Sequence, residues 1–239
     1  MRENIFRFKQ FSVRNERSAM KVGTDGVLLG ALCSVESVNS VLDVGCGTGL
    51  IALMIAQRTR NAIIDSVEID ADAYNEALLN YAESPWNNRL FCFLTDFREF
   101  TEKCHKKYDL IVSNPPFYTE DVTPPDSQRL LARHCSALSF KELIESSIPR
   151  LSDNGKLWFI SPTNRENEIA NIIAANKIYI SNKTIIFPKT GVAAKRIVWA
   201  LTKNPVSNIL INNLTIENSI HHDYTDEYIA LTRDFYLKM

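Results

Sequence analysis

The sequence lacks the segments and cysteine patterns of membrane, secreted and disulfide-bonded proteins. The first residues, MRENIFRFKQ, hold no apolar signal segment, and the longest apolar runs, VLLGALC and LIALMIA, are far too short to cross a bilayer. The five cysteines form no Cys-x-x-Cys pair, which is typical of free thiols in a reducing cytosol and predicts no metal site. We therefore expect a cytoplasmic protein without membrane or metal partners, in which the adjacent His221 and His222 lie on an exposed turn.

A strong excess of acidic or basic residues is missing too, because the formal net charge is only −1. The basic residues are nevertheless unevenly distributed. Residues 1–22 hold six basic and two acidic residues, a net +4, and residues 169–216 hold six basic residues and no acidic ones. Charge alone leaves open whether these stretches form a nucleic-acid face or an ordinary solvated surface.

Phosphate-binding glycine motifs are also absent. The segment VLDVGCGTGLIALMIAQ (41–57) predicts a buried strand, a glycine-rich turn and an apolar helix, but a dinucleotide fingerprint starting at Gly45 and Gly47 would need glycine where Leu50 stands. No P-loop pattern occurs either. Asp43 lies two residues before Gly45, where a carboxylate suits an ammonium group, or a water bound to one, better than a pyrophosphate.

Strands and helices alternate along most of the chain. The predicted strands lie near 40–45, 62–68, 89–95, 108–113 and 155–161, and the predicted helices are 48–59, 70–83, 97–104, 139–149 and 164–175. This alternation predicts a Rossmann-like α/β fold, with a mostly parallel sheet and helices on both faces. Two β-rich runs, 178–187 and 193–202, predict a C-terminal antiparallel hairpin at one edge. We expect one domain, made of an N-terminal ribbon and helix (1–39), a core (40–204) and a C-terminal extension (205–239).

Acidic residues follow three successive predicted strands. Asp43 ends the first strand, Glu68 ends the second, and Asp96 follows the third. At these places the acids suit an amine, a pair of ribose hydroxyls and an adenine amino group, with Ile69 and Phe97 beside them. Each acid alone is more typical of a helix N-cap or a surface carboxylate, but the ordered set favours a cationic nucleoside without phosphate, which is S-adenosylmethionine.

The motif "DVGCGTG", with this order of elements, resembles the class I S-adenosylmethionine-dependent methyltransferases over roughly residues 40–200. This resemblance explains the stretch "LIVSNPPF" (110–117). Its two prolines cannot extend a central strand and instead fix a rigid loop at the end of the strand. Asn114 and the carbonyl of Pro115 would accept the two hydrogens of a planar amino group, Pro116 would stiffen the loop, and Phe117 would stack on the base.

The resemblance narrows to the tRNA1(Val) (adenine(37)-N6)-methyltransferases. It is carried by "FRFKQFSV", "AMKVGTDGVLLGA", "NPPF", "RLLARH" and the terminal "YTDEYIALTRDFYL", and it spans nearly the whole chain. This resemblance implies methyl transfer to a splayed-out anticodon-loop adenine, and we expect a monomer. It places Lys21, Thr24 and Asp25 near the methionine end of the cofactor. The residues expected to meet RNA are Arg129, Arg133, Lys189, Lys195 and Arg196.

Three other functions stay open at this point. Two are enzymes: a methyltransferase for another RNA base amine, and one for a protein glutamine amide. The amide enzymes carry tyrosine at the fourth motif position and a separate helical N-terminal domain, whereas this chain has Phe117 and only about forty residues before the fold. The third is a catalytically inactive RNA-binding module, against which the intact Asp43, Glu68 and Asn114 argue.

Overall fold

The computed structural model describes residues 5–18, 21–116 and 138–238. Three predicted substrate-binding residues, Phe117, Arg129 and Arg133, lie outside these described residues. The helices are α1 (Thr24–Leu32), α2 (Leu50–Arg58), α3 (Ala71–Ala82), α4 (Phe97–Lys103), α6 (Phe140–Ser147), α7 (Glu166–Ala175) and α8 (Asp226–Thr232), with short 3-10 helices η1 (Asn87–Arg89), η2 (Ile148–Arg150) and η3 (Thr163–Arg165). None of the described helices is both long and apolar enough to cross a membrane.

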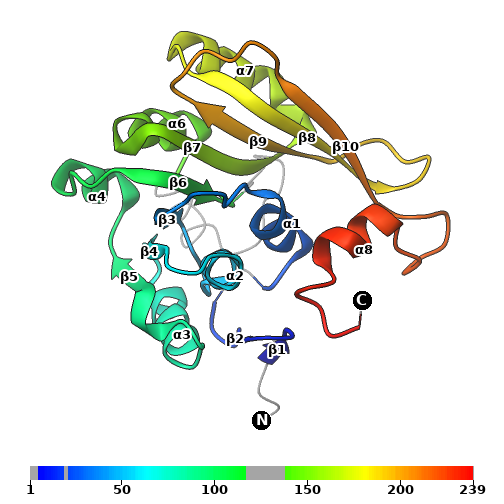
Figure 1. Ribbon diagram of the computed structural model, residues 1–239, viewed down its shortest axis with the longest axis horizontal. Coiled ribbons are helices and arrows are strands. Elements are labelled where there is room, and N and C mark those ends of the chain that lie inside the picture. The colour runs from blue at the N-terminus through cyan, green and yellow to red at the C-terminus, as the bar shows by residue number, and fades with distance from the viewer. Residues whose placement is uncertain (1–4, 19–20, 117–137, 239) are drawn as a thin grey trace, which may run out of the picture.

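A central sheet organises the molecule (Figure 1). Its strands are β3 (Ser40–Val44), β4 (Ile63–Glu68), β5 (Leu90–Leu94), β6 (Tyr108–Ser113), β7 (Leu151–Pro162), β8 (Tyr179–Lys189), β9 (Arg196–Thr202) and β10 (Leu210–Glu217). Their order across the sheet is β10-β8-β9-β7-β6-β3-β4-β5. Only β9 runs against its neighbours among these strands, so the carboxyl ends of the others lie along one edge, together with the start of β9.

The predicted Rossmann-like fold is confirmed. Every strand and helix predicted between residues 40 and 202 is present, and the largest difference is that β7 begins at Leu151 rather than near residue 155. The antiparallel hairpin of β8 and β9 is present too. It does not lie at the edge, however, because β10 pairs in parallel with β8 and covers it. The sequence gives little sign of β10, since Leu214 is its only buried residue and an edge strand therefore shows no clear alternation.

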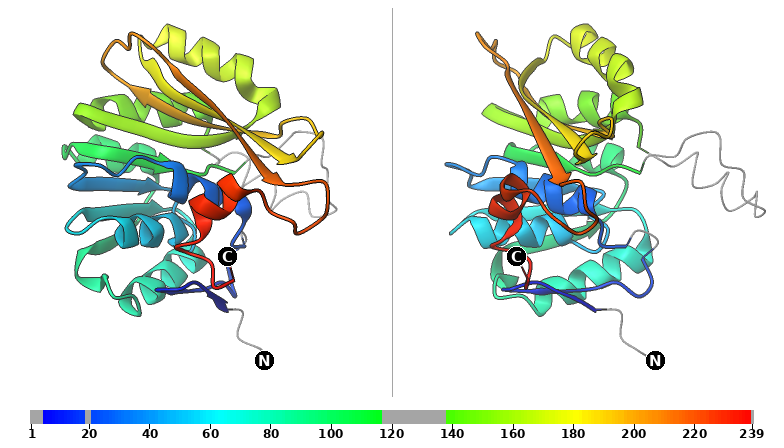
Figure 2. Two further views of the ribbon diagram at one scale, coloured as in Figure 1. Left: turned by 45° about the vertical axis from the view of Figure 1, so that its right-hand side comes forward. Right: turned by 90° about the vertical axis from the view of Figure 1, so that its right-hand side faces the viewer.

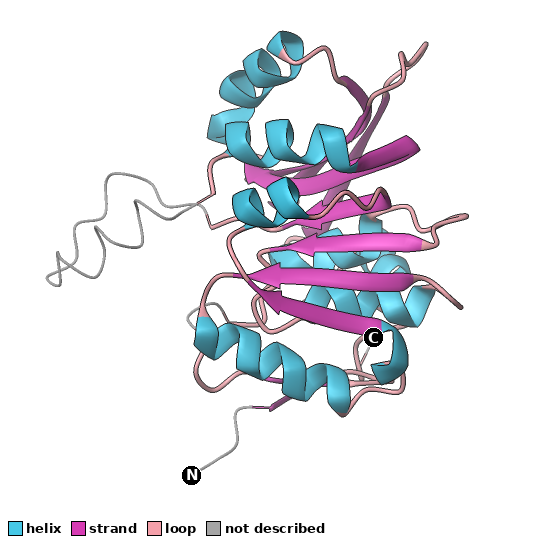
Figure 3. Ribbon diagram, turned by 90° about the vertical axis from the view of Figure 1, so that its left-hand side faces the viewer, coloured by secondary structure: helices cyan, strands magenta, loops and turns pink. Residues whose placement is uncertain are grey.

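Helices cover both faces of the sheet because successive strand residues point to opposite sides (Figure 3). Trp158 and Ile160 of β7 pack in one hydrophobic cluster with α1 and α2, whereas Leu157 and Phe159 pack in a second cluster with α6 and α7. α2 is buried all round from Leu50 to Ala56, which explains why its sequence is apolar throughout rather than along one stripe.

The N-terminal ribbon and the tail after α8 lie side by side, on the face of the sheet that carries α1 (Figure 2). The short strands β1 (Ile5–Arg7) and β2 (Ser12–Arg14) form the predicted antiparallel ribbon. The Lys9 amide donates to the Phe235 carbonyl at 2.8 Å, and Phe8 forms a bridge with Tyr236. The tail after α8 is thereby joined to the N-terminal ribbon.

Candidate active site

The glycine-rich turn after β3 lies at the crossover point of the sheet, where β3 has β4 on one side and β6 on the other. Ligands of such folds bind at the carboxyl ends of the strands at this point. Gly45, Gly47 and Gly49 have φ angles of +66°, +56° and +82°, which other residues rarely adopt. A Cβ built on Gly45 or Gly47 would touch nothing within 4 Å. The space above the turn is therefore open to a ligand.

Gly49 is required for a different reason. A Cβ at this position would lie 2.3 Å from the ring of Tyr81 on α3, far inside contact distance. Tyr81 cannot easily move, because its hydroxyl shares a hydrogen bond of 2.7 Å with Ser66 of β4 and the residue is only 2% exposed. The third glycine therefore lets the turn pack closely against α3.

Asp43 lies beneath the turn and is completely buried. Its Oδ2 accepts from the Ala52 amide at 3.1 Å, and its Oδ1 has no hydrogen-bond partner within the described part of the chain. Burial raises the pKa of Asp43 from 3.8 to about 7, opposed by the Ala52 amide and assisted by the charge of Glu68. This unsatisfied buried carboxyl favours a positive charge nearby.

Glu68 ends β4 and is 8% exposed. Its Oε2 accepts from the Gly47 amide at 2.7 Å, and its Oε1 accepts from the amides of Ile69 and Asp70 at 2.8 and 2.9 Å. One carboxylate thus joins the glycine turn to the loop after β4. A carboxylate offers about four acceptor positions, so one position on Oε2 remains for a ligand hydroxyl.

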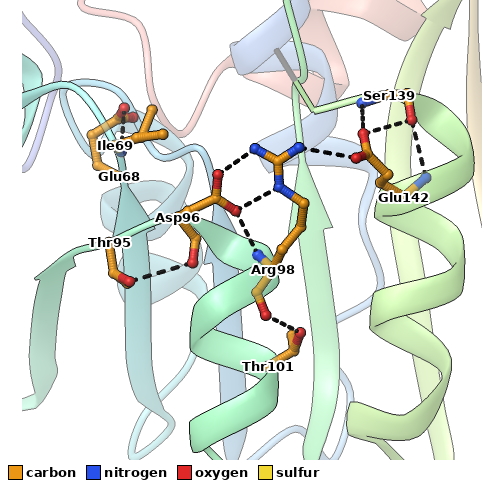
Figure 4. A network of polar contacts seen from close by, with 8 residues as sticks. All are labelled: Glu68, Ile69, Thr95, Asp96, Arg98, Thr101, Ser139 and Glu142. Atoms are coloured by element: carbon orange, nitrogen blue, oxygen red, sulfur yellow. Dashed lines mark hydrogen bonds and ion pairs between the residues drawn. The ribbon is translucent and has the colours of Figure 1, made fainter. Parts of the chain in front are cut away.

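Asp96 caps α4 and is held by an arginine (Figure 4). Its Oδ1 accepts from the Arg98 amide at 2.7 Å and from Arg98 Nε at 2.9 Å, while Oδ2 pairs with Arg98 Nη2. Arg98 Nη1 also donates to Glu142 at 2.9 Å, in the capping box of α6. The hydrogen bonds from Arg98 lower the pKa of Asp96, which keeps it a carboxylate acceptor.

The two apolar residues predicted beside these acids differ in exposure. Ile69 is 52% exposed at the end of β4, so its side chain is available to the flat face of a ligand. Phe97 is 5% exposed and packs in the hydrophobic cluster that contains Val67 and Ile111. Contact between Phe97 and the cofactor stays a prediction.

Asn114 follows β6 directly and lines a cavity of about 400 Å³. The other walls include residues 45–48 of the glycine turn and the segment 21–26. Pro115 is buried and Pro116 half-buried, and Ser113 anchors the strand end by donating to the Val44 carbonyl at 2.9 Å. The structure therefore brings Asn114 to the same cavity as the glycine turn.

Lys21, just before α1, and Thr24 and Asp25, the first two residues of α1, are three more predicted residues that line this cavity. Asp25 Oδ2 accepts from Arg196 Nε at 2.9 Å, and Arg196 also lines the cavity. Arg196 was predicted to contact RNA from the hairpin, but it lies at the same site as the cofactor residues because β9 begins at this edge of the sheet. Lys195 is exposed beside it, and Lys189 is half-buried at the end of β8.

Comparison with known proteins assigns the family. A sequence profile of the methyltransferase small domain matches residues 18–178. The chain is 48% identical to a tRNA1(Val) (adenine(37)-N6)-methyltransferase of Flavobacterium johnsoniae over 98% of its length and 100% of the relative. It is 42% identical to the protein of that name from Bacteroides fragilis, with both chains covered completely. The chain belongs to the tRNA1(Val) (adenine(37)-N6)-methyltransferase family.

Solved structures agree with the methyltransferase fold. A predicted O-methyltransferase from Agrobacterium tumefaciens superposes with a TM-score of 0.67 at 18% identity, covering 88% of this chain and 96% of that one. TrmN from Thermus thermophilus superposes with a TM-score of 0.54 at 16% identity, covering 75% of this chain and 48% of that one. The family and the fold imply the use of S-adenosylmethionine by this methyltransferase.

Two residues of α3 that are not predicted from the sequence hold the site together in this tRNA methyltransferase. The Glu76 carboxylate accepts from the amides of Glu16, Arg17 and Ser18 at 2.6, 2.7 and 3.0 Å. Asn80 donates to the Thr48 carbonyl at 2.8 Å and accepts from the Arg14 amide, also at 2.8 Å. They fix the chain that leads to Lys21 against the glycine turn. The sequence signal that could have indicated them is a pair of polar residues, four apart, on the helix face that also carries the buried Ala73 and Ala77.

The predicted exposed turn at His221 and His222 has one further feature. Glu217 Oε2 lies 3.1 Å from His221 Nδ1, and Glu217 Oε1 lies 4.0 Å from His222 Nδ1. The ligand atoms of the three residues all lie within 4.8 Å of one another, the only such group found among the described residues. Cys33, Cys46, Cys92 and Cys104 are free thiols, as expected.

Proposed function

We propose that this protein transfers a methyl group from S-adenosylmethionine to the exocyclic N6 amine of adenine 37, next to the anticodon of tRNA1(Val). The observation that carries the proposal is the position of Asn114. It follows a buried strand, is succeeded by two prolines, and lines the same cavity as the open glycine turn. The family supports the choice of substrate.

The residues around the turn fit S-adenosylmethionine. Open space above Gly45 and Gly47 leaves room for the ligand, and the unsatisfied buried Asp43 favours its positive charge. Glu68 has an acceptor position left for a ribose hydroxyl, and the exposed Ile69 offers an apolar surface to adenine. Lys21, Thr24 and Asp25 would border the methionine part, while Asp96 and Phe97 would border the base. When bound, S-adenosylmethionine supplies a methyl group that is electrophilic because it is attached to a positively charged sulfonium.

Asn114 and Pro115 would prepare the amine of the substrate. The amine lone pair is delocalised into the adenine ring, so the nitrogen is a poor nucleophile. The Asn114 side-chain oxygen and the Pro115 carbonyl would accept its two hydrogens and stabilise the positive charge that develops during transfer. Pro116 would stiffen the loop and Phe117 would stack on the base. No general base is required, since the amine proton becomes acidic once the methyl is attached.

The target adenine must leave its stack in the anticodon loop, which costs a few kcal/mol. Three basic residues at the same edge of the sheet, Lys189 at the end of β8 and Lys195 and Arg196 at the start of β9, would hold the neighbouring phosphates, together with Arg129 and Arg133. We infer that the chain works in the cytoplasm as a monomer of one domain. It would need no metal, because the transferred methyl is already activated.

The test is to incubate the protein with labelled S-adenosylmethionine and total tRNA, then to digest the RNA and map the modified nucleoside. We expect N6-methyladenosine at position 37 of tRNA1(Val). Label in ribosomal RNA or in protein glutamine would redirect the substrate assignment. Absence of transfer to any of these acceptors would mean that the fold binds RNA without catalysis.

A further inference from the structure

A second, larger cleft of about 800 Å³ lies beside the active-site cavity. Six segments of the chain form it: β1, residues 22–24 at the start of α1, the end of β8, the end of β10 with the turn that follows, α8 and the C-terminal tail. Its walls include the aromatic residues Phe6, Tyr224, Tyr228 and Tyr236.

The cleft shares a wall with the active site. Val22, Gly23 and Thr24 line both the cleft and the cavity that holds Asn114. β10 contributes to this position, since it runs parallel to β8 and its carboxyl end, at Glu217, lies at the same sheet edge as the glycine turn. A ligand that fills the active site can therefore continue into the cleft across a wall of three residues.

The aromatic side chains suit the stacking of a flat ring. The rings of Phe6 and Tyr236 lie 6.1 Å apart, and those of Tyr224 and Tyr228 lie 5.3 Å apart. Tyr228 is 3% exposed and belongs to the core, whereas Phe6 is 39% exposed. Half-buried aromatic side chains at a cleft wall are the surfaces on which unpaired RNA bases stack.

Polar and charged groups border the aromatic walls. Glu217, His221 and His222 offer hydrogen-bonding atoms for the edge of a base, and Arg7 and Lys238 supply positive charge. Glu217 is the one acidic residue that lines the cleft among the described residues, and the hydrogen bonds from His221 and His222 lower its pKa. The cleft therefore combines stacking surfaces with donors, acceptors and cations, as expected for a nucleotide rather than for an apolar ligand.

From this arrangement we infer that the cleft is a second nucleobase site, which takes an unpaired base of the anticodon loop flanking the target adenine. The inference rests on the proposed function and adds a substrate contact to it. Phe6 and Tyr224 provide the stacking surfaces, and Arg7 contacts the adjoining phosphate. With the target adenine in the active site and the flanking base in the cleft, the two neighbouring bases are held out of the loop stack, one on each side of residues 22–24.

The test measures the affinity of an anticodon stem-loop RNA for variants of the two aromatic residues. Phe6→Leu and Tyr224→Leu keep apolar volume but lose the planar ring, and each should weaken RNA binding roughly tenfold, the loss of one base stack. Phe6→Tyr keeps a ring and should bind like the wild type. The matched control is Phe91→Leu, which should leave affinity unchanged. Phe91 is similarly exposed, at 45%, and lies on the opposite edge strand β5.

Measurements of salt dependence and of cofactor binding distinguish the loss of a base stack from other causes of weaker RNA binding. The leucine variants should keep the wild-type salt slope, because they remove no cation, whereas Arg7→Ala should flatten it by roughly 0.7. All five variants should bind S-adenosylmethionine with unchanged affinity by calorimetry. A fluorescent adenine analogue at the flanking nucleotide should be quenched by the wild type and not by Tyr224→Leu.

Two outcomes would overturn the inference while leaving the proposed function intact. One is full RNA affinity in both leucine variants of a protein that still methylates adenine 37. The other is a concentration-dependent dimer, seen by sedimentation and lost in Phe6→Leu, which would assign the cleft to a second copy of the chain. If the wild type transfers no methyl to tRNA, the proposed function fails first and independently.

Discussion

Protonation of Asp43 should be linked to cofactor binding. In the unliganded protein its pKa is about 7, so close to half of the molecules carry a neutral Asp43 at pH 7. A cation bound above the glycine turn interacts with this carboxyl across a low-dielectric interior and favours its ionised form. Binding should then release about half a proton per cofactor at pH 7. Affinity should rise with pH up to about 7 and level off above it.

The size of the effect follows from the same pKa. At pH 6 about one Asp43 in eleven is ionised, so the cofactor should bind about tenfold more weakly than at pH 8, which corresponds to about 1.4 kcal/mol. Calorimetry at one pH, in two buffers with different ionisation enthalpies, measures the proton release directly. Asp43→Asn removes the titrating group and should abolish both the proton release and this part of the pH dependence.

The same group affects stability without cofactor. Asp43 has its ordinary pKa of 3.8 in the unfolded chain and a raised one in the folded protein, so the folded state binds more protons between these values. The free energy of unfolding should therefore fall as pH rises from about 4 to 7, and Asp43→Asn should remove that fall. Two results together would contradict a raised Asp43 pKa: identical heats of cofactor binding in both buffers for the wild type, and no fall in its free energy of unfolding between about pH 4 and 7.

Three further predictions concern the rest of the site. Asn114→Ala should lower the single-turnover methylation rate by roughly 10²–10³ with cofactor affinity unchanged, and Asn114→Asp should keep partial activity; a full rate in the alanine variant would exclude the proposed role. Gly49→Ala should lower the free energy of unfolding by roughly 2–5 kcal/mol in urea titrations, because strain and a clash add. Gly191 has φ +79° and open space around a built Cβ, so Gly191→Ala should cost only the backbone strain. If both alanine variants lose the same free energy of unfolding, the clash at Gly49 is contradicted. Lys195→Ala should reduce the salt slope of tRNA binding by roughly 0.7 and spare the cofactor, whereas Arg196→Ala should also weaken cofactor binding, since Arg196 pairs with Asp25 in the cavity. If Lys195→Ala leaves the salt slope of tRNA binding unchanged, this lysine is solvated and does not contact the RNA.

The sequence by itself determined the parts of this protein that depend on local chemistry. Buried strands and helices have periods that show directly in the order of apolar residues, so the elements between residues 40 and 202 were predictable. The turn at Gly45 and Gly47 needs positive φ angles, and the prolines after Asn114 end a strand wherever they occur. These requirements lie within a few residues of each other, and no tertiary contact is needed to recognise them.

Only the tertiary structure decided which distant residues meet. β10 is a mostly exposed edge strand, so its pattern is weak, and its pairing with β8 was not predictable. The ion pair of Arg196 with Asp25 joins residues far apart in the chain, and it exists because β9 runs against its neighbours and begins at the active edge. The pKa of Asp43 likewise depends on how completely the surrounding elements exclude water from one carboxyl, and burial of that kind is a property of the packed molecule rather than of any stretch of its sequence.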